Sequence, residues 1–189
     1  MIRIGILGDI GSGKSYVAKT FGYPVFNADV EVGKIYKTNK KIFLKLNKSL
    51  PKHIQTFPIN KFEITKAILE NKINLKKIIK IVHTEVRKKM NVFLRKNRNK
   101  KIIIMDIPLL LENKINIKKD ILIFVQTKKL DVLKRLKKRK NYNKQLISKF
   151  KKIQLPLDYK KKKSHFIIKN NFTKNIKKDV KTILKKIKT

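Results

Sequence analysis

A glycine-rich turn directly after a short apolar run constrains this chain more than any other feature. The run from Ile2 to Leu7 has the length of a strand, and it leads into residues 8 to 15, Gly-Asp-Ile-Gly-Ser-Gly-Lys-Ser. A helical pattern follows through Phe21, and residues 23 to 27 restart as a second strand. This order of strand, loop, helix and strand predicts an α/β fold with a parallel sheet.

Apolar runs of strand length recur in the second half of the chain. Residues 102 to 105 and 121 to 125 are continuous apolar runs, and residues 166 to 168 form a last short one. Such runs are typical of parallel strands that are covered on both faces. We therefore expect a three-layer αβα core with a five-stranded parallel sheet and with ligands at the carboxyl ends of the strands.

The segments between these strands have helical patterns. Residues 30 to 98 carry apolar side chains at spacings of three and four, interrupted by a loop between Pro51 and Pro58. Residues 128 to 163 predict two charged helices around Asn141-Tyr142-Asn143, and residues 173 to 187 predict a final amphipathic helix. The lysine run from Lys160 to Lys163 is expected to form a solvated helix end.

The length and composition favour one soluble domain. A chain of 189 residues suits a single α/β domain, and the absence of cysteine excludes a disulfide framework and a cysteine-based zinc site. The apolar start is too short for a signal sequence or a membrane span. We expect a cytoplasmic protein without a membrane segment.

The charge is strongly positive, with 51 Lys and Arg against 12 Asp and Glu and a formal net charge of +39. A basic protein of this kind would ordinarily suggest a nucleic-acid partner. The lysines lie in every segment, however, and lysine greatly outnumbers arginine, as expected from compositional bias. We predict no specific nucleic acid, only weak binding to polyanions that falls with added salt.

The turn at residues 8 to 15 has the full G-x-x-x-x-G-K-S pattern between a strand and a helix, which indicates a phosphate-binding loop. Its glycines let the backbone N–H groups point inward around phosphates. Lys14 can reach the β- and γ-phosphates, and the Ser15 hydroxyl can bind Mg²⁺. An ordinary turn between a strand and a helix is the structural alternative.

The loop alone does not separate GTPases, ATPases and kinases, but two features disfavour a GTPase. The guanine-reading pattern Asn-Lys-x-Asp is absent, and Asp106 is followed by Ile-Pro-Leu instead of an Asp-x-x-Gly switch. The second strand ends before Asp29, whose carboxylate could orient a substrate hydroxyl. Its structural alternative is a helix N-cap.

Several blocks resemble the dephospho-CoA kinase family in order and spacing across nearly the whole chain. They are the loop at 8 to 15, Asn27-Ala28-Asp29, Asp106-Ile107-Pro108-Leu109-Leu110-Leu111-Glu112-Asn113, Gln154-x-Pro156 and Asn170. The resemblance implies a P-loop kinase core with a helical substrate-binding insertion near residues 31 to 98 and a helical lid near 135 to 163. It also implies ATP-dependent phosphorylation of the 3′-hydroxyl of dephospho-CoA, the last step of coenzyme A synthesis.

The resemblance assigns roles to individual residues. It implies that Asp29 activates the hydroxyl, with Lys14 and Arg139 as the other catalytic residues, and that Leu109 and Glu112 belong to the substrate site. The predicted nucleotide site comprises Gly11, Ser12, Gly13, Lys14, Ser15, Tyr16 and Arg139, and Ser15 is the predicted metal ligand. The implied cofactors are ATP and Mg²⁺, and the expected state is a monomer. Each role has a structural alternative. Glu112 could simply begin a helix. Arg135 and Arg139, one helical turn apart, could lie on a solvated helix face.

The chain departs from the family pattern outside the phosphate loop. The family usually has Asp at position 27, Arg at 33 and a His-Pro pair at 80 and 81, where this chain has Asn27, Gly33, Lys80 and Ile81. Further departures are Lys61, His165 and Lys169. These departures concern how the insertion binds the substrate and do not affect the phosphate site. A nucleoside or nucleotide kinase, and a basic P-loop protein with nucleic-acid-stimulated ATP turnover, therefore remain alternatives.

Overall fold

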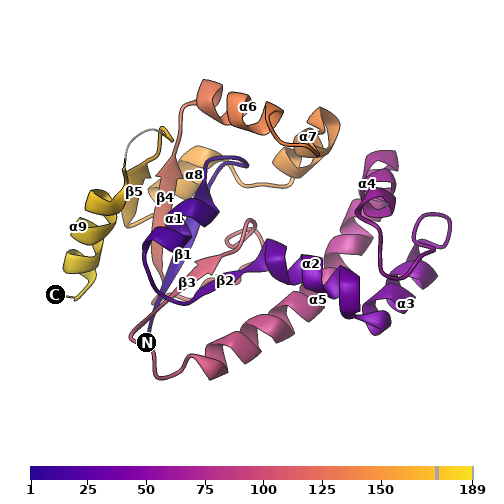
Figure 1. Ribbon diagram of the computed structural model, residues 1–189, viewed down its shortest axis with the longest axis horizontal. Helices are drawn as coiled ribbons and strands as arrows, with labels where there is room; N and C mark the ends of the chain where they lie inside the picture. The colour runs from indigo at the N-terminus through magenta and orange to yellow at the C-terminus, as the bar shows by residue number, and fades with distance from the viewer. Residues whose placement is uncertain (173–174, 189) are drawn as a thin grey trace. The chain divides into compact units, whose positions relative to one another are not determined.

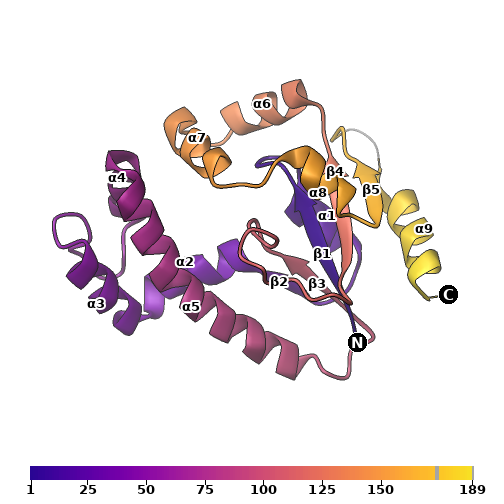
Figure 2. The same cartoon turned by 180° about the vertical axis from the view of Figure 1, so that it is seen from behind.

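The computed structural model describes residues 1–172 and 175–188. Its elements in chain order are β1 (Ile2–Gly8), α1 (Lys14–Thr20), β2 (Val25–Asn27), α2 (Ala28–Thr38), α3 (Lys40–Ser49), α4 (Lys61–Glu70), α5 (Lys72–Lys96), β3 (Ile102–Asp106), β4 (Ile121–Gln126), α6 (Lys129–Lys137), α7 (Lys144–Lys152), α8 (Leu157–Lys162), β5 (Phe166–Lys169) and α9 (Lys177–Lys188). Figures 1 and 2 show them from opposite sides. Within the described ranges, no helix has the length and apolar character needed to cross a bilayer.

The chain forms two compact units. The core unit comprises Met1–Asn27, Asn97–Tyr142 and Ile153–Thr189. The helical unit comprises Ala28–Lys96 and Asn143–Lys152. The core unit holds the sheet and the phosphate-binding loop, and the helical unit holds α2 to α5 together with α7.

The described strands of the core unit form one parallel sheet in the order β2-β3-β1-β4-β5. β1 lies between β3 and β4, with Gly5 opposite both Met105 and Leu122. All of β3 is buried, as its run of Ile and Met side chains predicts for a strand covered on both faces. This confirms the predicted α/β fold and its five-stranded parallel sheet.

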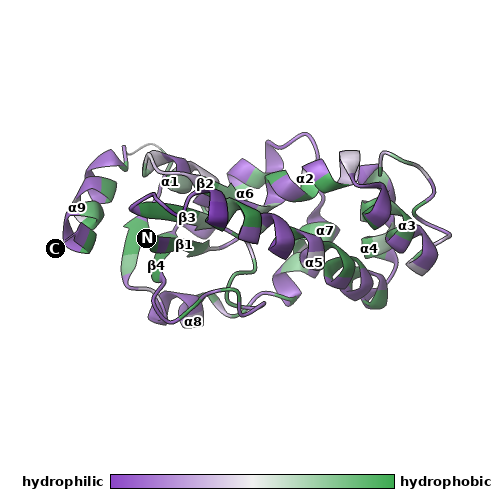
Figure 3. Ribbon diagram, turned by 90° about the horizontal axis from the view of Figure 1, so that it is seen from below, coloured by the Kyte–Doolittle hydropathy of each residue, from purple (hydrophilic) through white to green (hydrophobic). Residues whose placement is uncertain are grey.

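Helices cover both faces of this sheet. Apolar side chains of α1 and α9, such as Val17 and Val180, pack with Ile4 and Ile6 of β1 on one face. α8 contacts β1 and lies on the opposite side of the sheet from α1 and α9, as Figure 3 shows. Because the strands are parallel, the carboxyl ends of β1, β2 and β3 meet at one edge, at Gly8, Asn27 and Asp106.

Gly5 allows the turn after β3 to pack against β1. A Cβ atom at Gly5 would lie 2.6 Å from Cδ2 of Leu110 and 2.9 Å from Cδ2 of Leu122. Leu110 is 0% exposed. Only a residue without a side chain fits here, so Gly5 fixes the distance between β1 and the turn that follows β3.

The helical unit packs around the long helix α5. Its buried residues Leu75, Ile78, Val82 and Val86 recur at spacings of three and four, and α5 contacts α2, α3 and α4. This confirms the predicted helical pattern. The connection between α3 and α4 includes the expected loop from Pro51 to Pro58.

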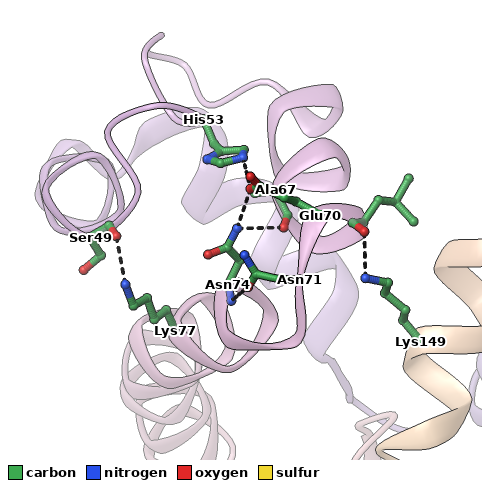
Figure 4. Close-up of polar contacts among 9 residues, drawn as sticks. Ser49, His53, Ala67, Glu70, Asn71, Asn74, Lys77 and Lys149 are labelled. Carbon is green, nitrogen blue, oxygen red and sulfur yellow. Dashed lines mark hydrogen bonds and ion pairs between the residues drawn. The ribbon is translucent and has the colours of Figure 1, made fainter.

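Polar side chains secure the C-terminal end of α4 in the helical unit. Asn74 is buried, and its Nδ2 donates to the Ala67 carbonyl at 3.1 Å and to Glu70 Oε2 at 2.9 Å. His53 also pairs with Glu70, and Lys149 of α7 donates to the Leu69 carbonyl at 2.7 Å. Figure 4 shows these contacts. Asn74 and Lys149 thus supply partners to carbonyls of the last helical turn, which otherwise lack them.

Residues 128 to 163 differ from the prediction of two helices. They form α6, α7 and α8, and the third helix begins after Pro156, which is its N-cap. α6 ends at Lys137, so Arg139 lies in a turn instead of on one helix face with Arg135. Continuing α6 would place like charges four residues apart, Lys134 with Lys138 and Arg135 with Arg139, which disfavours continuation. The predicted start of the final helix, at residues 173 and 174, lies outside the described residues.

We predict that Gly5→Ala lowers the free energy of unfolding by about 1–3 kcal/mol, because the added methyl group overpacks the contact with Leu110 and Leu122. Gly33→Ala is the matched control, since Gly33 lies inside α2 with nothing within 4 Å of the position that its methyl group would take. The control should raise that free energy by about 0.5–1 kcal/mol through helix propensity. Urea unfolding of both variants measures this. Equal effects would contradict the role of Gly5.

Candidate active site

The phosphate-binding loop connects the end of β1 at Gly8 to the start of α1 at Lys14. Gly11 and Gly13 have φ values of 86° and 90°, a region that disfavours residues with a side chain. A Cβ at Gly11 would lie 2.9 Å from Cγ of Leu136, and a Cβ at Gly13 would lie 2.4 Å from Nδ2 of Asn170. The two glycines are therefore needed for both conformation and space.

Two side chains from distant strands hold the outer side of the loop. The carbonyl of Ser12 accepts a hydrogen bond from Asn170 Nδ2 at 2.9 Å and from Thr127 Oγ1 at 3.1 Å. Asn170 is 1% exposed, and its Oδ1 accepts from the Phe172 N–H at 3.2 Å. In a planar trans peptide the N–H points away from the preceding carbonyl, so the Gly13 N–H is directed away from Asn170. Asn170 and Thr127 thus fix the orientation of this peptide.

These two residues were not among the predicted site residues. Asn170 was part of the family pattern but had no assigned function, and no sequence motif pointed to Thr127. Both directly follow a strand, β5 and β4 respectively. A polar residue at the carboxyl end of a buried parallel strand is the feature that could have indicated them.

Lys14 folds over the loop. Its Nζ donates to the Asp9 carbonyl at 2.8 Å and to the Gly8 carbonyl at 3.3 Å. The ammonium group is thereby held by the first two carbonyls of the loop, at the end of β1.

Ser15 lies beside a pair of polar residues at the ends of β2 and β3. Asn27 Nδ2 lies 2.5 Å from Asp106 Oδ2 and 3.5 Å from Ser15 Oγ. Asp106 is 3% exposed, whereas Ser15 is exposed. Hydroxyl and carboxylate oxygens are the donors that Mg²⁺ prefers beside substrate phosphates, so these residues fit the ion. Asp106 was not a predicted site residue, although a carboxylate at the end of an apolar run of strand length could have indicated it.

Two arginines lie at the end of α6 and just after it, in the core unit. The guanidinium of Arg135, in the last turn of α6, lies 4.4 Å from the ring centroid of Phe172. Arg139 is exposed in the following turn, where its N–H donates to the Leu136 carbonyl at 3.1 Å. Tyr16 is 48% exposed on the first turn of α1.

Leu109 and Glu112 lie in the turn after β3. The Leu109 carbonyl accepts from the backbone N–H of Asn113 at 3.1 Å and from its Nδ2 at 2.9 Å. The Glu112 side chain is 9% exposed and pairs with Lys160. Glu112 is therefore held in a turn of the core unit and does not begin a regular helix.

Asp29 belongs to the helical unit. Helix α2 begins at Ala28, so Asp29 lies in its first turn and not at the cap position. Its side chain is exposed. A carboxylate in the first turn also interacts favourably with the helix dipole.

A parallel sheet of this order, with a complete phosphate-binding loop after β1 and Asp106 at the end of β3, defines the class of P-loop nucleotide-binding enzymes. Within this class, the chain belongs to the dephospho-CoA kinase family, whose model, described as dephospho-CoA kinase, matches residues 2–175.

Individual proteins support this assignment. A dephospho-CoA kinase from Wolbachia of Brugia malayi is 32% identical over 176 residues, which cover 90% of each chain. A crystal structure from Thermus thermophilus has a TM-score of 0.74 at 23% identity and covers 98% of this chain and 95% of the other. The dephospho-CoA kinase from Campylobacter jejuni has a TM-score of 0.65 at 21% identity, with 98% and 96% covered. The two structures show the shared fold.

This assignment confirms the resemblance to the dephospho-CoA kinase family that the sequence motifs indicated. It also confirms the predicted enzyme, an ATP-dependent kinase of coenzyme A biosynthesis that acts on dephospho-CoA. The roles of individual residues remain predictions.

We predict that Asn170→Leu weakens ATP binding about 10-fold, because the Ser12 carbonyl loses a buried donor and the Gly13 peptide is less constrained. Asn141→Leu, at an exposed position of the core unit, is the matched control and should bind ATP as the parent does. Calorimetric titration with ATP measures both, alongside melting curves. Parental affinity in folded Asn170→Leu would contradict the assigned role.

Proposed function

We propose that this chain transfers the γ-phosphoryl group of Mg²⁺-bound ATP to the ribose 3′-hydroxyl of dephospho-CoA. The observation that carries the proposal is the phosphate-binding loop with its Ser12 carbonyl held from outside, next to Ser15 and the buried Asp106. This arrangement supports phosphoryl transfer, which needs positioning and charge neutralisation more than covalent chemistry.

The loop residues Gly11 to Ser15 bind the ATP phosphates through their backbone N–H groups. Lys14 exchanges the carbonyls of Gly8 and Asp9 for oxygens of the β- and γ-phosphates. Tyr16, in the first turn of α1, borders the nucleotide. Arg139 supplies a further positive charge to the transferred group, and Arg135 belongs to the same lid near residues 135 to 163.

Ser15 and Asp106 would hold the magnesium ion, and Asn27 holds Asp106 in place by donating to its carboxylate. When bound, the ion neutralises negative charge on the phosphates. The Ser15 hydroxyl and the Asp106 carboxylate provide the oxygen donors for it.

Asp29 orients the 3′-hydroxyl and accepts its proton as the oxygen attacks the γ-phosphorus. A bond forms between this oxygen and phosphorus, and the bond from phosphorus to the ADP oxygen breaks. Leu109 and Glu112 contribute to the acceptor site, together with the helical insertion near residues 31 to 98. The position of Asp29 two residues after Asn27 supports this assignment. We place the reaction in the cytoplasm, with a monomeric enzyme and no specific nucleic-acid partner.

A coupled ADP-release assay with and without dephospho-CoA tests the proposal. We expect ADP formation to depend on this acceptor and the product to carry a 3′-phosphate. A panel of nucleosides and nucleotides, and added DNA or RNA, forms the comparison. Faster turnover with any of these than with dephospho-CoA would reject the proposed acceptor.

We predict that Lys14→Ala lowers kcat about 100-fold or more, because the ammonium stabilises charge on the transferred phosphoryl group. Lys19→Ala is the matched control, since Lys19 is an exposed lysine of the same helix. The control should retain parental kcat in the ADP-release assay. Near-parental turnover in folded Lys14→Ala would remove Lys14 from the mechanism.

We predict that Asp29→Asn binds ATP as the parent does but loses most of its kcat, because the amide cannot accept the proton of the hydroxyl. The fall in kcat should be much larger than any rise in KM for ATP. Glu31→Gln, in the same first turn of α2, controls for the loss of a negative charge near the helix start. If Asp29→Asn retains parental kcat, Asp29 serves only the helix.

A further inference from the structure

A buried lysine in α8 departs from the rest of this lysine-rich chain. Lys160 is 1% exposed, whereas its neighbours Lys161 and Lys162 are exposed. The prediction of a solvated helix end was therefore wrong at Lys160. Its Nζ lies 2.6 Å from Oε1 of Glu112, whose side chain is 9% exposed. Because burying two charges has a large desolvation cost, such a pair is weak evidence for stability and calls for another reason.

The carboxylate of Glu112 joins three segments of the core unit. Its Oε1 accepts from Lys160 of α8 and from the Leu155 N–H at 3.0 Å. Leu155 lies where the chain re-enters the core unit after α7. Glu112 itself lies in the turn whose Leu110 packs on Gly5 of β1. The carboxylate is thus fixed relative to the strand that leads into the phosphate-binding loop.

The second oxygen of this carboxylate, Oε2, differs from Oε1 in its hydrogen bonding. Glu112 Oε2 is buried, and no group of residues 1–172 and 175–188 hydrogen-bonds to it. Buried polar atoms of proteins nearly always have a hydrogen-bond partner. Since Oε1 already receives two donors, Oε2 is the oxygen that remains for a donor from a bound molecule.

We propose that Lys160 is a positioning residue of the acceptor site. It binds Oε1 of Glu112, fixes the direction of the carboxylate, and so leaves Oε2 to accept a hydrogen bond from a hydroxyl or amide N–H of the acceptor. This inference rests on the proposed function, in which Glu112 belongs to the acceptor site. Lys160 acts through Glu112 and touches neither ATP nor the reacting atoms.

Lys160→Met tests the proposal, because methionine keeps the length of the side chain and removes its charge. The KM for dephospho-CoA should rise about 10-fold or more, as expected for loss of a well-directed hydrogen bond to a charged group. The KM for ATP should stay within about twofold of the parental value, because the phosphate contacts are independent of Glu112. Lys161→Met, an exposed neighbour in the same helix, is the matched control and should match the parent.

A double variant separates this role from a purely structural one. In Glu112→Gln with Lys160→Met the buried charges are both gone, and the glutamine carbonyl can still accept from the Leu155 N–H. This variant should melt closer to the parent than Lys160→Met, yet its KM for dephospho-CoA should remain raised because an amide nitrogen replaces one carboxylate oxygen.

The outcomes are distinct. A parental KM for dephospho-CoA in either folded variant, with only a lower melting temperature, would overturn the inference. If Lys160→Met fails to fold, the double variant decides. An equal rise in both KM values would also overturn it. If the parental protein itself forms no ADP in response to dephospho-CoA, the proposed function fails first, and the inference fails with it.

Discussion

The orientation of one peptide, between Ser12 and Gly13, is the constraint on which the nucleotide side of this structure depends. A loop that offers N–H groups to phosphates must turn carbonyls outward, and a buried carbonyl needs donors. Asn170 and Thr127 supply them from the ends of β5 and β4. The sheet order matters because it brings two residues that are distant in sequence to the outer side of the same turn.

Scarce acidic residues tie the core unit together. The chain has 12 Asp and Glu, and three of them hold their side chains away from solvent against a partner from another segment. Asp120 pairs with Arg3 at 3.0 Å, Glu112 with Lys160, and Asp106 with Asn27. Burial raises the pKa of Asp120, while the Ile117 N–H and Arg3 oppose that rise. The excess of lysine stays largely on the surface, where it costs little.

Asn27 stands beside Ser15 and Asp106 at a position where the family usually has a carboxylate. The family usually has Asp where this chain has Asn27. The amide of Asn27 donates to Asp106 at 2.5 Å, whereas two carboxylates at this distance would repel unless a proton or a cation lay between them. The polar connection from Ser15 to Asp106 is therefore retained by a neutral donor.

The sequence by itself determined the strands, the helical insertion, the phosphate-binding loop and the family, because these follow from local spacing of apolar residues and from residue types at fixed offsets. It did not indicate Thr127, the third helix after Pro156 or the departure of Arg139 from α6. It also predicted a solvated Lys160. Only the tertiary structure decided these features, since burial and hydrogen-bond partners depend on which distant segments pack together. Within the run of lysines, nothing local distinguishes the one that meets Glu112 from the ones that meet water.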